Sequence, residues 1–154
     1  MFSKILVLGL AFGLASCSQD LPGVEQSQSP EILPTVRTAT IKNQTFSLED
    51  AYTPEQKDKG LKFRSSIGED EGMLFTFLPR AKPKFFMHEV YIPLDIIFVT
   101  NGKVVGLDNM KPCKTKKEEC PTFSPPVRID YAIELKAGTS EKLSLVIGDE
   151  VEIK

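Results

Sequence analysis

The alternation of apolar and polar positions along this chain predicts a series of short β-strands. A period of two is typical of a strand that buries one face, and it recurs between turn-forming residues from Val36 onward. Within Val127–Leu135 the apolar side chains stand at alternate positions, which predicts a strand with a single buried face. Tyr91–Val99 is the most apolar of the expected strands. The stretches expected to form strands are 36–41, a short strand through Phe46 and Leu48, 73–77, 84–87, 91–99, 103–107, 127–135 and 150–153.

Two short helices are expected among these strands. Thr53 can cap a helix, Pro54 suits the first helical position, and Gln56 stands where a capping box requires Glu or Gln. The sequence that follows is polar and is interrupted at Gly60, so this helix should be short and exposed. Residues 139–143 are expected to form one further helical turn.

Turn signals and the number of strands together define the expected fold class. Asn101-Gly102 is a strong signal for a two-residue β-hairpin, and residues 79–83 are expected to connect two strands. Many short strands with few helices predict a single, mainly β domain over residues 36–154, an antiparallel β-sandwich or barrel. The chain of 154 residues, 41% hydrophobic, is long enough to bury one core.

The N-terminal segment predicts export and a lipid anchor. Residues 1–16 carry one positive charge, Lys4, ahead of an apolar stretch too short to span a bilayer, as in a secretory signal. Leu14–Cys17 resembles the bacterial lipoprotein signal, which implies cleavage before Cys17 and lipid on that residue. Residues 17–35, rich in Ser, Gln and Pro, are then a flexible tether. We expect a lipid-anchored protein of the cell envelope, facing the periplasm or the cell exterior; the alternative is an ordinary signal with an incidental cysteine.

The remaining cysteines are expected to pair. With Cys17 acylated, Cys113 and Cys120 are left in an oxidising compartment, where a disulfide is favoured. The chain-entropy model gives about 2–3 kcal/mol for closing so short a loop. A zinc site is the alternative, but two cysteines without paired histidines do not complete a ligand set.

Charge and motifs limit the functions to be considered. The net charge of −2 gives no electrostatic case for binding nucleic acid. The sequence has no nucleophile elbow, phosphate-binding glycine loop or His-Glu-x-x-His motif, so it does not decide whether the protein is an enzyme. No cofactor is expected.

Several blocks of residues occur along the chain in the order in which a known family has them. They are Gly60-Leu61, Arg64, Gly72–Phe75, Phe86-Met87, Pro93–Ile96, Pro112-Cys113, Cys120-Pro121, Tyr131, Glu134-Leu135, Ala137-Gly138 and Gly148-Asp149. Through these blocks the chain resembles the domain of unknown function 192 family. The resemblance implies a compact, β-rich, jelly-roll-like domain that is often exported, and it implies no activity. Where the family usually shows Trp-Met-Lys-Asn-Thr, this chain has Phe86-Met87-His88-Glu89-Val90.

Asp95 is the most informative polar residue, because it lies within an apolar run with apolar residues on both faces. A buried carboxylate needs a cation or several N–H donors, otherwise it takes up a proton. Arg64 and Arg128 are possible partners, and N–H groups of a loop are the alternative. A structural role is favoured over a ligand-binding or catalytic one.

His88 and Glu89 could act together as acid and base, but neighbours on a strand point to opposite faces unless a bulge intervenes. Three methionines, Met73, Met87 and Met110, together with His88 suggest a copper(I) site. Against this, methionines in apolar strands usually fill gaps in a core, and no ligand spacing is present. We therefore expect no metal.

Three functions remain open. The first is a small binding or accessory module for a small ligand or envelope component, with a patch formed by Arg64, Met87, His88, Glu89 and Asp95. The second is an envelope hydrolase acting on glycans with paired carboxylates from Glu89, Asp95 and Glu134. The third is a structural or assembly partner without a pocket. A cleft with two facing carboxylates favours the hydrolase, a shallow patch favours binding, and a continuous apolar edge favours the partner.

Overall fold

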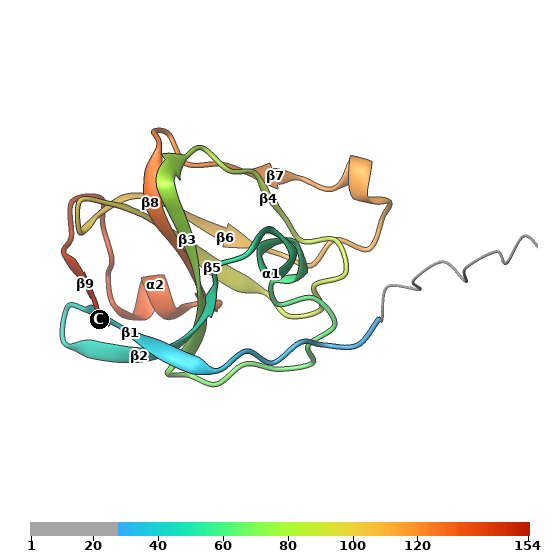
Figure 1. Ribbon diagram of the computed structural model, residues 1–154, viewed down its shortest axis with the longest axis horizontal. Helices are drawn as coiled ribbons and strands as arrows, with labels where there is room; N and C mark the ends of the chain where they lie inside the picture. Colours follow the sequence, from blue (N-terminus) through green and yellow to red (C-terminus); the bar gives the residue numbers. More distant parts are fainter. Residues whose placement is uncertain (1–27) are drawn as a thin grey trace, which may run out of the picture.

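The computed structural model describes residues 28–154 (Figure 1). The expected signal peptide (1–16), the lipidation at Cys17 and most of the expected tether lie outside the described residues. The strands are β1 (Thr35–Ile41), β2 (Gln44–Ala51), β3 (Glu71–Ala81), β4 (Phe85–Phe86), β5 (Leu94–Thr100), β6 (Lys103–Met110), β7 (Thr122–Phe123), β8 (Ile129–Lys136) and β9 (Val151–Ile153). The helices are α1 (Pro54–Lys59), α2 (Thr139–Lys142) and the 3-10 turn η1 (Lys117–Glu119).

Seven of these strands form one sheet in the order β6-β5-β8-β3-β2-β1-β9, and β4 pairs with β7 in a small second sheet. The prediction of a single, mainly β domain with one or two short helices is confirmed. One pair, β2 with β3, is parallel, within a sheet that was expected to be mostly antiparallel. Between β2 and β3 the chain passes through α1 and returns to the end of the sheet at which β2 began. β3 therefore runs in the same direction as β2.

The large sheet curls until its two outermost strands approach each other. The backbone N–H of Val104 in β6 donates to the carbonyl of Asp149, 2.9 Å away, just before β9. The N–H of Gly148 donates in turn to the carbonyl of Val104 at 2.8 Å. These bonds join the sheet edges at one end, which leaves fewer unpaired backbone groups exposed there.

Curling of the sheet creates two hydrophobic cores, one on each face. The inner core lies within the curl and is closed by the segment around α2, which contributes Leu145. The outer core lies on the opposite face, under the chain that follows α1 and under the segment from Phe85 to Ile92. The largest buried side chains of the inner core are Ile41, Phe46, Leu48, Leu74 and Ile97, and those of the outer core are Leu61, Met73, Phe75, Met87, Leu94, Ile96 and Phe98.

The central position of β8 corrects one prediction. Val127–Leu135 was expected to bury one face, but Val127 is exposed and lies outside the strand. Because β8 lies between β5 and β3, its second face is also covered, and Ala132 and Glu134 are buried there. A strand inside a two-sided sheet is buried on both faces, so its polar residues cannot be assumed to meet solvent.

Local rules predicted the turns and helix ends well. The capping box of α1 is complete: the Thr53 hydroxyl accepts from the Gln56 N–H at 3.2 Å, and the Gln56 side chain accepts from the Thr53 N–H at 2.9 Å. Gly60 ends this helix with φ +48°. Asn101 and Gly102 form the hairpin between β5 and β6 with φ of +51° and +67°. Positive φ at both positions is what a type I′ turn requires.

Strand lengths were predicted less accurately. β3 continues to Ala81, through part of the expected 79–83 connection, with a register shift against β8 between Thr76 and Ala81. β5 begins at Leu94, after Pro93, and Tyr91 is exposed. Pro93 has no N–H for the ladder, which explains why pairing starts behind it.

The expected disulfide is present. Cys113 and Cys120 are bonded, with their Cα atoms 5.8 Å apart. The Cys113 N–H donates to the Met87 carbonyl at 3.2 Å, and β7, just after Cys120, pairs with β4. The disulfide therefore fastens the segment that carries Phe85 and Phe86 onto the outer face of the sheet.

The packed domain extends further toward the N-terminus than the expected boundary at Val36. Leu33 is buried in the outer core, and its N–H donates to the Glu49 carboxylate at 2.6 Å. Between residues 28 and 154 the structure contains no helix with the length and apolar character needed to cross a bilayer.

Candidate functional site

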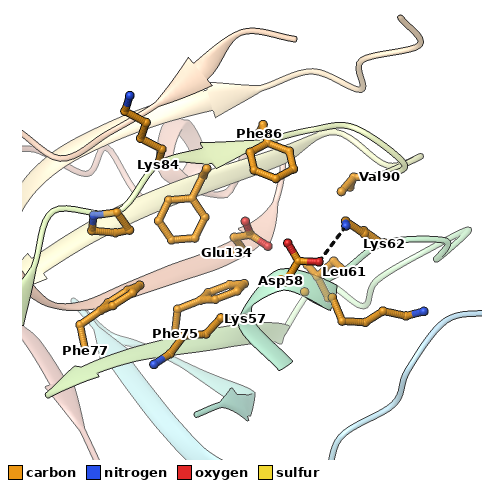
Figure 2. Close-up of a pocket in the computed structure, with 14 residues that line it drawn as sticks. Lys57, Asp58, Leu61, Lys62, Phe75, Phe77, Lys84, Phe86, Val90 and Glu134 are labelled. Carbon is orange, nitrogen blue, oxygen red and sulfur yellow. Dashed lines mark hydrogen bonds and ion pairs between the residues drawn. The ribbon is translucent and has the colours of Figure 1, made fainter. Parts of the chain in front are cut away.

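A cavity of about 250 Å³ lies on the outer face of the sheet, between α1, β3 and β4 (Figure 2). Phe75 and Phe85 meet edge to face with ring centroids 5.2 Å apart, and Phe77 contacts Phe85 in the same way at 6.4 Å. Such contacts fix the ring orientations, so the wall is a rigid aromatic surface. The apolar residues that line the cavity are Leu61, Phe75, Phe77, Pro83, Phe85, Phe86 and Val90.

Glu134 supplies a carboxyl group to this apolar cavity. It stands on β8 between Met73 of β3 and Ile96 of β5, on the strand face opposite to Ile133 and Leu135. Its residue surface is only 6% exposed. Figure 2 shows the carboxyl group directed into the space between Phe75, Phe86 and Leu61.

The carboxyl group of Glu134 has no hydrogen-bond partner among residues 28–154. Burial disfavours its charged form and raises its pKa to about 8, although the positive charge of Arg64 acts in the opposite direction. At neutral pH the group is therefore mostly protonated. A protonated carboxyl offers one O–H donor and one carbonyl acceptor to whatever occupies the cavity.

Lysines surround the mouth of the cavity. Lys62 Nζ lies 3.4 Å from the Asp58 carboxylate and 3.6 Å from that of Glu89. Lys57 Nζ lies 5.0 Å from the centroid of the Phe77 ring, and burial lowers its pKa. Four lysines line the cavity, against Asp58 and the buried Glu134, so the mouth is positively charged: Lys57, Lys59, Lys62 and Lys84.

The disulfide loop reaches the same mouth from the other side. Lys117 of η1 places its Nζ 4.4 Å from the centroid of the Phe86 ring and 3.9 Å from the Asp58 carboxylate. Asp58 belongs to α1 and Phe86 to β4. Lys117 thus connects the two sides of the cavity at its rim.

Arg64, a member of the expected patch, is buried beside the cavity and does not line it. Its guanidinium donates to both oxygens of Glu49, at 2.6 and 2.7 Å, and also to the carbonyl of Glu31. The two parallel hydrogen bonds make this a well-oriented ion pair. Glu49 also accepts from the Leu33 N–H, so the Arg64–Glu49 ion pair holds the segment that contains Glu31 and Leu33 on the domain.

Asp95 lies on the opposite face of the sheet, and the expected pairing with Arg64 or Arg128 is wrong. Its carboxylate accepts from the Asn109 side chain and from the Ser140 backbone N–H, each at 2.8 Å. N–H donors replace the arginine, as the alternative proposed, but they come from β6 and from the first turn of α2 and not from a loop. On β5 the side chain of Asp95 points the same way as Ile97, into the inner core, which separates it from Arg64.

The other members of the expected patch do not form a common site with Asp95. Met87 is buried in the outer core together with Met73 and Met110. His88 and Glu89 are half-buried, with His88 Nδ1 3.6 Å from the Glu89 carboxylate. Across residues 28–154 no three His, Cys, Asp or Glu side chains gather as a metal site would require.

The cavity itself was missed at the level of sequence, although Glu134 had been considered. The signal that could have identified it is a charged residue within the apolar run Ala132–Leu135, the same signal that drew attention to Asp95. The aromatic walls come from β3 and β4, which the strand pattern alone does not place opposite each other. Lys117 belongs to a loop whose position depends on the disulfide.

Comparison with known proteins agrees with the resemblance found in the sequence. Residues 36–153 match the profile of a family described as an uncharacterised ACR, the domain of unknown function 192 family. The chain belongs to this family. No curated protein matches it.

Two solved structures share the fold. A protein of unknown function from Novosphingobium aromaticivorans is 29% identical, with a TM-score of 0.67, over 80% of this chain and 92% of that chain. A protein from Sinorhizobium meliloti, named as a candidate transcription regulator, is 25% identical, with a TM-score of 0.68, over 79% of this chain and 97% of that chain. Neither similarity brings an assigned ligand or reaction.

Proposed function

We propose that this protein is a small-ligand-binding module of the bacterial cell envelope and that the cavity over Glu134 is its binding site. The observation that carries the proposal is a buried carboxyl group without a partner among the described residues, facing an apolar cavity. Leaving a polar group unpaired in such surroundings is costly. A ligand that supplies a hydrogen-bond partner while filling the apolar space removes that cost.

The surroundings of Glu134 define what the cavity can do for a ligand. The rigid walls formed by Phe75, Phe77 and Phe85 offer apolar contact to a flat or branched group. The protonated carboxyl group fixes the orientation of one polar atom. Given the size of the cavity, a ligand of about ten heavy atoms should bind in the micromolar to millimolar range.

The location in the envelope rests on two features. The segment Leu14–Cys17 resembles the lipoprotein signal, and the Cys113–Cys120 disulfide suits an oxidising compartment. Mass spectrometry of protein extracted from membranes should find lipid on Cys17. An unmodified Cys17 in that material would overturn the proposed anchor.

Binding in the cavity can be tested with 4-methylphenol, a neutral single-ring probe that depends on no charge at the mouth. In an NMR titration we expect saturable shifts concentrated on Leu61, Phe75, Phe85, Val90 and Glu134. Shifts spread over the surface, or none at millimolar probe, would overturn the proposed function.

A variant that fills the cavity supplies the matched comparison. Val90→Phe adds a ring to a buried residue of the lining and should abolish the saturable shifts. Val127→Phe, at an exposed position outside the cavity, should leave them unchanged. If Val90→Phe binds 4-methylphenol as the wild type does, the cavity is not the site. A thermal melt of both variants shows whether each is folded.

A hydrolase is the second candidate, and one observation favours it: Asp58 and Glu134 line the same cavity in different environments. Asp58 is largely exposed beside Lys62, whereas Glu134 is buried and protonated. Two carboxyl groups in such different surroundings can serve as acid and as base or nucleophile. The pair differs from the one expected, because Asp95 lies on the other face of the sheet.

Chromogenic 4-nitrophenyl glycosides test this second candidate. If it holds, the wild type hydrolyses one of them, and Glu134→Gln and Asp58→Asn each abolish the reaction. If the protein hydrolyses none of these glycosides faster than buffer does but still binds 4-methylphenol, the hydrolase is rejected and the binding module stands.

A further inference from the structure

We propose that the ligand of this cavity is a single-ring aromatic compound that carries one anionic group on a short arm, with the ring inward and the anion at the lysine rim. The inference rests on the proposed function and names the class of ligand for the same site. It is drawn from the size of the cavity, the charge at its mouth and the chemistry of its floor.

The volume suits a ligand with one substituted ring. A cavity of about 150 Å³ lined by apolar side chains is sufficient to bind benzene. The cavity here is about 250 Å³, which accommodates a substituted ring with a short arm. Three of the walls are phenyl rings already packed edge to face, Phe75, Phe77 and Phe85, and they present ring edges and faces to an incoming ring.

The charge at the mouth selects an anion. Four lysines line the cavity, and Asp58 is the one acidic residue besides Glu134 among its lining residues. Lys62 is held between Asp58 and Glu89, but Lys84 is exposed at the mouth. Aromatic rings alone could attract an ammonium group, yet the lysines around them repel one.

The floor determines which end of the ligand enters. An anion directed inward would meet the Glu134 carboxyl group in apolar surroundings, where an unpaired charge is strongly disfavoured. A hydroxyl group at the inner end of the ring could instead accept the O–H of Glu134. A ring with a para hydroxyl and an acidic arm therefore satisfies both ends of the cavity.

Three probes that share a 4-hydroxyphenyl ring and differ in the charge of the arm test the inference: 4-hydroxyphenylacetate, the neutral alcohol tyrosol and the amine tyramine. At about pH 6.5, below the pKa of Glu134, the acid should bind up to about fivefold more tightly than tyrosol, and tyramine more weakly than tyrosol. Equal affinities, or tighter binding of tyramine, would overturn the ligand class. Because 4-methylphenol has no charged arm, its binding reports on the proposed function separately.

Variants separate the two ends of the cavity. Lys84→Gln should weaken the binding of 4-hydroxyphenylacetate and leave the binding of tyrosol unchanged. Lys82 is an exposed lysine of the same segment outside the cavity, so Lys82→Gln should change the binding of neither probe. Equal effects of the two substitutions would contradict a role for the rim. Phenylacetate, which lacks the hydroxyl group, should bind several-fold more weakly than 4-hydroxyphenylacetate. If it binds equally well, Glu134 does not contact the ring substituent.

Discussion

The carboxylate of Asp95 accepts a hydrogen bond of 2.8 Å from the backbone N–H of Ser140, in the first turn of α2. The N-terminal residues of a helix have N–H groups without partners inside the helix, and Gly138 before α2 has no side chain to cap them. The Asp95 carboxylate of β5 thus caps the N-terminus of α2. The contact holds α2 over one end of the inner core.

Removal of this contact should destabilise the fold. Asp95→Ala leaves the Ser140 N–H and the Asn109 amide without their acceptor, and we expect a loss of about 2 kcal/mol in the free energy of unfolding. Urea melts measure it. Asp108→Ala, an exposed carboxylate on the neighbouring strand, should change stability by less than about 0.5 kcal/mol. Equal melts for Asp95→Ala and the wild type would contradict the structural role.

Glu134 should make stability fall as the pH rises. Its pKa is about 8 in the folded protein, against an ordinary glutamate value of 4.5, so the native protein binds an extra proton between these two pH values. Stability is fully retained below about pH 4.5 and is progressively lost as the pH rises toward and through 8, by several kcal/mol in total. Denaturant melts of wild type and Glu134→Gln at pH 5 and pH 9 measure this dependence.

Asp58 and four lysines, Lys57, Lys59, Lys62 and Lys84, line the cavity around Glu134, and the charge of Arg64 acts on Glu134 from beside it. All of these groups are kept in the Glu134→Gln variant. Its stability should therefore vary less between the two pH values than that of the wild type. If the stability difference between pH 5 and pH 9 is as large in Glu134→Gln as in the wild type, Glu134 is not the group that titrates.

The disulfide should support both stability and the cavity. Cys113→Ser/Cys120→Ser is expected to lose about 2–3 kcal/mol, the magnitude of a short closed loop. The same variant should bind 4-methylphenol more weakly, because β7 and Lys117 no longer hold Phe86 in place. Reductant should lower the stability of the wild type and leave the double variant unaffected. Wild-type protein that melts identically with and without reductant would argue against the bond.

Glu89 adopts a backbone conformation that suits another residue better. Its φ is +64°, in the left-handed region that Asn tolerates more readily than Glu. Glu89→Asn should be more stable than Glu89→Ala by about 0.5–1 kcal/mol, since both lose the contact with Lys62 and only Ala keeps the strain. Thermal melts of the two variants give the comparison. Equal stabilities would mean that the backbone there carries no strain.

Features governed by near neighbours in the chain were predictable from sequence. The strand at Val36–Ile41, the capping box at Thr53 and the Asn101-Gly102 hairpin each depend on a few adjacent residues, and each was found, although Val36 itself is exposed. The pairing of Cys113 with Cys120 followed from counting cysteines. These features fixed the fold class but not the arrangement of the sheet.

Features that depend on distant segments were not predictable. The second buried face of β8 results from its position between β5 and β3, which the strand's own pattern does not contain. Asp95 was recognised as buried, but its partner Ser140 is 45 positions away and offers a backbone group that no sequence pattern marks. The cavity required three segments, α1, β3 and β4, to meet over a residue of β8.

The two-sided burial of β8 has a consequence for how this protein can diverge. Successive residues of the strand belong to different compartments, Ile133 to the inner core and Glu134 to the cavity. Substitutions at cavity-facing positions such as Glu134 can change the cavity lining without changing the side chains of the inner core. Insertion or deletion of one residue, however, would exchange the two compartments and send a carboxyl group into the interior. Descendants of this chain are therefore free to vary the cavity lining but are held to the same number of residues in β8.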